Sequence, residues 1–114
     1  MARSTEQVFQ DHVAALMRGD VEAIMRDYAP DAFLLAPQGV FAGLEAIRGY
    51  FSHAVANMPN AQMDMVGMQV HGDFVLCAWT ATFDTGSIPN GVDSFVIRDD
   101  RIHMQTCWMT VVPK

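Results

Sequence analysis

The sequence predicts an α+β domain in which helices come first and a run of hairpin-linked strands follows. In the first half, apolar residues recur every three to four positions, which is the period of an amphipathic helix. In the second half they alternate, which is the period of a half-buried strand. Helices followed by antiparallel strands are typical of the α+β class. The 114 residues fit one domain over 1–114, because domains cluster near 100–150 residues.

Three helices are expected, and each is set off by a residue that caps, ends or opens a helix. Ser4 or Thr5 can cap the first helix, and Gly19 can end it. Asp20 can cap the second helix, and Gly43 opens the third. The three predicted segments are residues 4–19, 21–28 and 44–57.

The strands are bounded by Pro, Gly and Asp clusters. Pro30 predicts a break before the first strand, and residues 84–91 are expected to form a loop. Gly72 and Asp99 mark tight turns. Expected strands are 32–36, 40–42, 61–71, 74–83, 92–98 and 102–112. Strict alternation in the third strand would place on one face Met63, Met65, Gly67, Gln69 and His71.

Composition and charge exclude several classes of partner. The chain is 51% apolar and only 18% charged, which predicts apolar surface hidden in a cavity or in a homo-oligomer interface. Its formal net charge is −6, and Lys and Arg never cluster. Nucleic acids and anionic membranes are therefore poor candidate partners. No apolar stretch reaches the length of a membrane span, and no secretory signal is visible, so a cytoplasmic location is expected.

The spacing of potential ligands does not predict a metal site. Cys77 and Cys107 are 30 residues apart and neither belongs to a CxxC motif, so both are expected to be free thiols. The histidines also lack the HxxxH and HExxH spacings of metal sites; they are His12, His53, His71 and His103. No metal and no other cofactor is expected.

Several stretches, in order along nearly the whole chain, carry a family resemblance. They include the first helix from Val8 to Leu16, the Gly19-Asp20 junction, and Gly43-Leu44-Glu45-Ala46-Ile47-Arg48. The C-terminal match is Val92-Asp93-Ser94-Phe95-Val96-Ile97. On these residues the chain resembles the NTF2-like superfamily, in particular its SnoaL-like and ketosteroid isomerase-like branch.

This resemblance implies a cone: a strongly curved, mostly antiparallel sheet around three helices, enclosing a deep apolar pocket. It also implies a homodimer through the outer sheet face and a small apolar molecule as partner. The fold says little about the reaction, because it hosts isomerases, cyclases, dehydratases, hydrolases and binding modules.

His12 is the first candidate catalytic residue. It lies on the apolar stripe of the first helix, between Phe9 and Leu16, and should face inward. Imidazole titrates near neutral pH, so His12 could act as an acid, a base or a hydrogen-bond donor. In ketosteroid isomerases the matching position carries an oxyanion-donating tyrosine. The alternative is a core histidine satisfied by a single partner.

Asp93 is the second candidate. It alternates with Phe95 and Ile97, so it should share their buried face. Burying a carboxylate is costly unless it is paired or protonated. A protonated aspartate that donates to an oxyanion, as in the known ketosteroid isomerase example, is what the resemblance implies here. The alternative is a strand-start aspartate bonded to loop amides.

Ala36 occupies the position at which the isomerases carry their general base. Alanine cannot move a proton, which argues against steroid isomerisation by the family mechanism. Strand alternation and the resemblance predict an apolar pocket lining of Phe33, Leu35, Phe51, Trp79, Phe83, Phe95, Gln105, Cys107 and Met109.

The sequence supports two hypotheses about function. The first is a cofactor-independent isomerase, cyclase or dehydratase that uses His12 and Asp93 on a small apolar molecule. The second is a non-catalytic ligand-binding or dimeric interaction module on the same fold.

Overall fold

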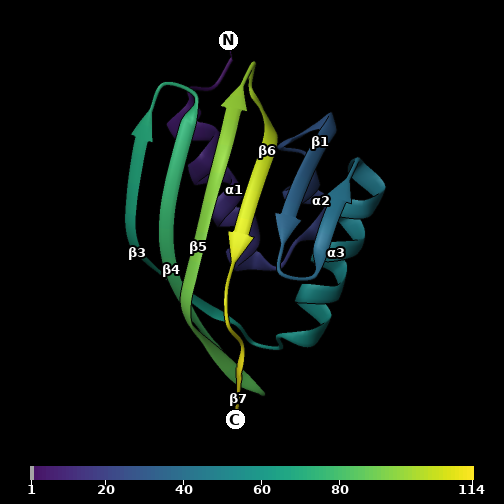
Figure 1. Ribbon diagram of the computed structural model, residues 1–114, viewed down its shortest axis with the longest axis vertical. Helices are drawn as coiled ribbons and strands as arrows, with labels where there is room; N and C mark the ends of the chain where they lie inside the picture. Colours follow the sequence, from purple (N-terminus) through teal and green to yellow (C-terminus); the bar gives the residue numbers. More distant parts are fainter. Residues whose placement is uncertain (1) are drawn as a thin grey trace.

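The computed structural model describes residues 2–114 and shows three helices packed on one face of a mixed, mostly antiparallel sheet (Figure 1). The helices are α1 (Thr5–Arg18), α2 (Val21–Met25) and α3 (Leu44–Asn57). The strands are β1 (Tyr28–Ala36), β2 (Gly39–Ala42), β3 (Gln62–His71), β4 (Phe74–Phe83), β5 (Gly86–Arg98), β6 (Arg101–Trp108) and β7 (Val112–Pro113). The predicted α+β class is therefore confirmed.

The strand order is β2-β1-β6-β5-β4-β3, with β7 paired to the start of β5. Neighbouring strands are antiparallel except β1 and β6, which run parallel. Helix α1 lies behind β4 and β5, whereas α3 lies against β1 and β2 (Figure 1). The two helices and the inner face of the sheet therefore surround a common space.

The helix boundaries follow the predicted caps. The Ser4 hydroxyl accepts a hydrogen bond from the backbone N–H of Gln7, and the Asp20 carboxylate accepts one from that of Ala23. Gly19 ends α1 in the left-handed conformation, with φ of 64°, which glycine adopts at little cost. The second helix is shorter than expected, because it ends at Met25 rather than at residue 28.

Two strands begin earlier than the sequence suggested. Strand β1 starts at Tyr28, because the chain passes through Pro30 with a shift in register instead of a break. Strand β5 starts at Gly86, so the predicted loop over 84–91 is wrong except for its first two residues. A second register shift places Pro89 in an irregular part of the β4–β5 ladder, where a missing N–H is tolerated.

The predicted alternation of β3 is also wrong beyond its midpoint. The register with β4 shifts between Met65 and Gly67, which moves the side chains that follow to the opposite face. Met68 and Val70 therefore pack against the core together with Met65. Strict alternation in the sequence cannot predict such a bulge, because the two halves of the strand alternate on opposite faces.

The core lies between the helices and the inner face of the sheet. Its largest fully buried side chains are apolar apart from His12; the apolar ones are Ile24, Leu34, Ile47, Ile97, Ile102, Val8 and Val75. Within residues 2–114, no helix is long and apolar enough to cross a membrane.

Gly91 lies opposite Trp79 across the β4–β5 ladder and leaves room for its indole ring. A Cβ atom at this position would overlap the ring, so we expect Gly91→Ala to lower the free energy of unfolding by about 1–3 kcal/mol. Urea denaturation measures the change. Gly67→Ala in β3 is the matched control, since no heavy atom lies within 4 Å of its added Cβ. Equal stability of the two variants would contradict the prediction.

Candidate functional site

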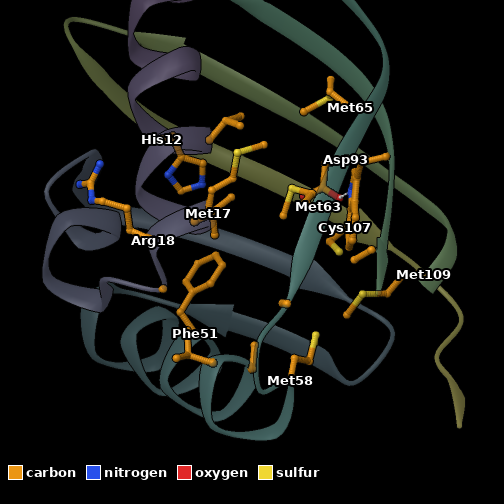
Figure 2. Close-up of a pocket in the computed structure, with 18 of the residues that line it drawn as sticks. His12, Met17, Arg18, Phe51, Met58, Met63, Met65, Asp93, Cys107 and Met109 are labelled. Carbon is orange, nitrogen blue, oxygen red and sulfur yellow. Dashed lines mark hydrogen bonds between the residues drawn. The ribbon is translucent and has the colours of Figure 1, made fainter. Parts of the chain in front are cut away.

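A cavity of about 390 Å³ lies between α1, α3 and the inner face of the sheet. Figure 2 shows His12 entering it from α1, Phe51 from α3, and Met63 from the facing strand β3. The wall is rich in sulfur, since it includes five of the nine methionines and both cysteines: Met17, Met58, Met63, Met65, Met109, Cys77 and Cys107. Methionine is flexible and polarizable, so this wall can adapt to ligands of different shapes.

Most residues expected at the pocket do line the cavity. His12 and Asp93 both lie at it. So do six of the nine residues expected in its lining, which are Phe51, Trp79, Phe95, Gln105, Cys107 and Met109. Gln105 and Cys107 therefore turn inward from β6.

Three expected lining residues lie elsewhere. Phe33 and Leu35 are 37% and 39% exposed on the outer face, because Leu34 between them takes the buried position in β1. Phe83 packs with Ala81 and Ile88 in a second core cluster that borders the cavity, and it does not itself line the cavity. The expectation was wrong for β1 because its two faces are equally apolar in sequence.

His12 is completely buried and is surrounded by aromatic rings. The rings of Tyr28 and Phe95 meet it edge-on, at centroid distances of 5.3 and 5.7 Å. Its Nε2 atom is 3.3 Å from the Tyr28 hydroxyl oxygen. Its Nδ1 atom makes no hydrogen bond, but it lies 3.6 Å from a carboxylate oxygen of Asp27. The imidazole is thus held between a hydroxyl group and a carboxylate.

Asp27 was not singled out in the sequence, where it lies between Arg26 and Tyr28. The Arg3 guanidinium contacts it at 2.9 Å and also contacts Asp11 and Asp100. Burial alone would raise the pKa of Asp27, but His12 and Arg3 together hold it below its ordinary value. Asp27 is therefore an anion that faces His12.

Asp93 is buried on β5 and accepts hydrogen bonds on both oxygens. Trp79 Nε1 donates to Oδ1 at 2.9 Å, and Gln105 Nε2 donates to Oδ2 at 2.8 Å. Burial raises the pKa of Asp93, while these donors partly oppose the shift. The expected alternative, bonding to loop amides, is not what holds this carboxyl group, because its partners are side chains of neighbouring strands.

Two residues connect the candidates into one network. The Tyr28 hydroxyl donates to Gln105 Oε1, and it also lies beside His12 Nε2. Gln105 in turn donates to Asp93. A continuous polar chain therefore runs from Asp93 through Gln105, Tyr28 and His12 to Asp27. Neither Tyr28 nor the linking role of Gln105 could be inferred from spacing, since the three strands that carry the network meet only in the folded sheet.

A family model for the SnoaL-like domain matches residues 9–103, which is most of the chain. The protein belongs to the SnoaL-like domain family. No curated protein matches the sequence. The predicted SnoaL-like membership is confirmed.

Solved structures similar to this SnoaL-like domain include proteins with different assignments. An NTF2-like protein of unknown function from Burkholderia xenovorans has a TM-score of 0.80 at 18% identity, covering 93% of this chain and 82% of its own. A provisionally assigned polyketide cyclase from Sinorhizobium meliloti has a TM-score of 0.77 at 21% identity, covering 89% and 93%. A provisionally assigned ketosteroid isomerase from Kribbella flavida has a TM-score of 0.80 at 13% identity, covering 96% and 80%. These likenesses show the fold and not a reaction.

Two thiols and a hydroxyl group line the cavity of the SnoaL-like domain near Asp93. Burial raises the pKa of the Cys77 thiol to about 12, and it raises the pKa of the Cys107 thiol further. The Tyr50 hydroxyl donates to Cys107 Sγ at 3.9 Å. Both thiols are therefore protonated near neutral pH, which argues against a thiolate nucleophile.

The raised pKa of Asp93 predicts how stability depends on pH. The folded protein binds a proton at this carboxyl group more readily than the unfolded chain does, so acidification toward the ordinary value of 3.8 favours the folded state. When the pH is lowered from 8 to 5, we expect the free energy of unfolding of the wild type to rise relative to that of Asp93→Asn. Urea denaturation at both pH values measures the difference, with the exposed Asp64→Asn as a charge-matched control. A wild type that loses stability relative to Asp93→Asn on acidification would contradict the raised pKa of Asp93.

Proposed function

We propose that this SnoaL-like domain binds a small, mostly apolar carbonyl compound and catalyses proton transfer at the carbon next to the carbonyl group. The observation that carries the proposal is the network that joins Asp93, at the cavity, to His12. Isomerisation, cyclisation and dehydration all include such a proton transfer. No cofactor is required for this chemistry.

Asp93 is the group proposed to exchange protons with the ligand. It retains 7% of its exposed surface, whereas His12 retains none. A carboxyl group with a raised pKa is a better base and is more readily protonated near neutral pH. His12 then acts through Tyr28 and Gln105 as the group that shares the proton with Asp93. This arrangement differs from that of the isomerases, whose base would correspond to Ala36, a residue outside the cavity lining.

A non-catalytic binding module is the second candidate function. It is favoured by the complete pairing of Asp93, whose two oxygens already accept hydrogen bonds from the protein. A ligand would then fill the sulfur-rich cavity without a proton transfer. The cavity is predominantly apolar with a few convergent polar groups, as small-molecule sites usually are.

The proposed reaction predicts solvent hydrogen exchange in a bound ketone. Cyclohexanone and 2-tetralone incubated with the protein in D₂O should gain deuterium next to the carbonyl faster than in buffer alone, measured by mass spectrometry. Asp93→Asn should abolish the enhancement and His12→Gln should reduce it at least about 100-fold. His71→Gln, at an exposed site at the end of β3, should retain it. Thermal stabilisation by these ketones without exchange would favour the binding module instead.

We also propose that a second copy of the chain covers the outer face of the sheet. Three cross-strand rows on this face carry no charged residue; they are Phe74-Val96-Met104-Phe33, Leu76-Ser94-Thr106-Leu35-Val40 and Ala78-Val92-Trp108. Trp108 is 66% exposed and Leu76 is 52% exposed. An apolar face of this extent in an acidic chain favours a self-complementary contact, since charged partners find nothing to pair with there.

Disruption of that face should yield a monomer. We expect light scattering coupled to size-exclusion chromatography to give a dimer mass for the wild type and a monomer mass for the double variant Leu76→Glu, Trp108→Glu. Ala56→Glu places one of these charges on the exposed side of α3, so it should remain dimeric. A wild type that is monomeric at about 100 µM, far above the Kd of a stable dimer, would refute the proposal.

A further inference from the structure

The network between His12 and Asp93 can be satisfied in two ways with the same number of protons. Each member has a defined set of donors and acceptors: indole donates only, carboxylate accepts only, and amide and hydroxyl groups do both. The structure fixes one end through Trp79, which donates to Asp93, and the other through Arg3, which keeps Asp27 anionic. The direction of every bond between these ends is then determined by the orientation of the Gln105 amide.

In the first arrangement, the one in the structure, Gln105 Nε2 donates to Asp93 and Gln105 Oε1 accepts from Tyr28. Because the Tyr28 proton is used, the Tyr28 oxygen accepts from His12 Nε2–H. His12 Nδ1 then faces the Asp27 anion, and it is satisfied only if it also carries a proton. Asp93 is an anion and His12 a cation in this arrangement.

In the second arrangement the Gln105 amide is rotated by half a turn. Asp93 is protonated and donates to Gln105 Oε1, Gln105 Nε2 donates to the Tyr28 oxygen, and Tyr28 donates to His12 Nε2. His12 keeps only its Nδ1 proton, which faces Asp27. Asp93 has gained one proton and His12 has lost one, so the total is unchanged and no other reactant is needed.

We propose that Gln105 is a positioning residue whose orientation decides whether His12 or Asp93 carries the shared proton. The inference deepens the proposed proton transfer at Asp93, but it concerns the protein alone and can be tested without a substrate. The proton that a ligand takes from Asp93 is then the one that the rotation has moved from His12, so Asp93 becomes an anion and His12 stays neutral until a proton returns.

The charged and titratable groups that face this network come from five parts of the fold. Asp27 and Arg3 face His12 from the α2–β1 junction and the N-terminal segment. Cys77 on β4, Cys107 on β6 and Tyr50 on α3 surround Asp93, and all three are neutral near pH 7 because burial raises their pKa values. Asp93 and His12 are therefore the two groups between which a proton can be shared.

The substitution Asp93→Asn should lock the second arrangement. Trp79 donates only, so it selects the oxygen of the introduced amide and turns the nitrogen of that amide toward Gln105. Gln105 must then present its oxygen, which rotates the rest of the network. With ¹⁵N-labelled histidine, NMR should show the His12 Nε2 proton in the wild type and its loss in the variant, with Nδ1 still protonated.

Gln105→Leu provides the decisive comparison. In this background the connection is cut, so Asp93→Asn should no longer change which nitrogen of His12 is protonated. A purely electrostatic effect of the lost charge would remove the Nε2 proton of His12 equally in both backgrounds, which would overturn the proposal. So would an unchanged Nε2 proton when Asp93→Asn is introduced into the otherwise wild-type protein. If Gln105→Leu does not fold, Tyr28→Phe cuts the same connection one residue further on, and the same outcomes apply.

Discussion

The burial of a carboxyl group and an imidazole beside an apolar cavity is the constraint on which the rest of the site depends. Neither group can be buried without partners, because a polar group removed from water loses several kcal/mol unless it is hydrogen-bonded. Asp93 obtains its partners from strands on both sides, through Trp79 on β4 and Gln105 on β6. The sheet therefore has to keep these three strands in register for the site to exist.

Two irregularities in the sheet help to place the side chains of the site. The shift in the β4–β5 ladder brings Gly91 opposite Trp79, and the absence of a side chain there lets the indole ring lie over the backbone and reach Asp93. The shift in β3 turns Met68 and Val70 toward the core after Met63 and Met65 have faced the cavity. The side chains of the site therefore pack as they do because these strands are irregular.

The far end of the network depends on a contact between distant parts of the sequence. Arg3 joins Asp27 to the β5–β6 turn at Asp100, and in doing so it keeps a negative charge next to His12. His12 thereby has an anion on one side and a hydroxyl group on the other. His12 therefore has one hydrogen-bond partner, the Tyr28 hydroxyl, as expected for a core histidine, and in addition it faces the Asp27 carboxylate.

The family was recognised from a resemblance along nearly the whole chain, whereas local patterns were enough to predict the α+β class, the three helices and the inward direction of His12 and Asp93. These features depend on periodicity and on caps such as Ser4 and Gly19, which act within a few residues. The same patterns could not establish the roles of Asp27, Tyr28 and Gln105, the outward position of Phe33 and Leu35, or the change of face within β3. Those features depend on strand register and on contacts between residues such as Tyr28 and Gln105, which are 77 positions apart and meet only when β1 pairs in parallel with β6. Local patterns carry no information about such pairings, because an apolar strand of either parity satisfies the same hydrophobic period.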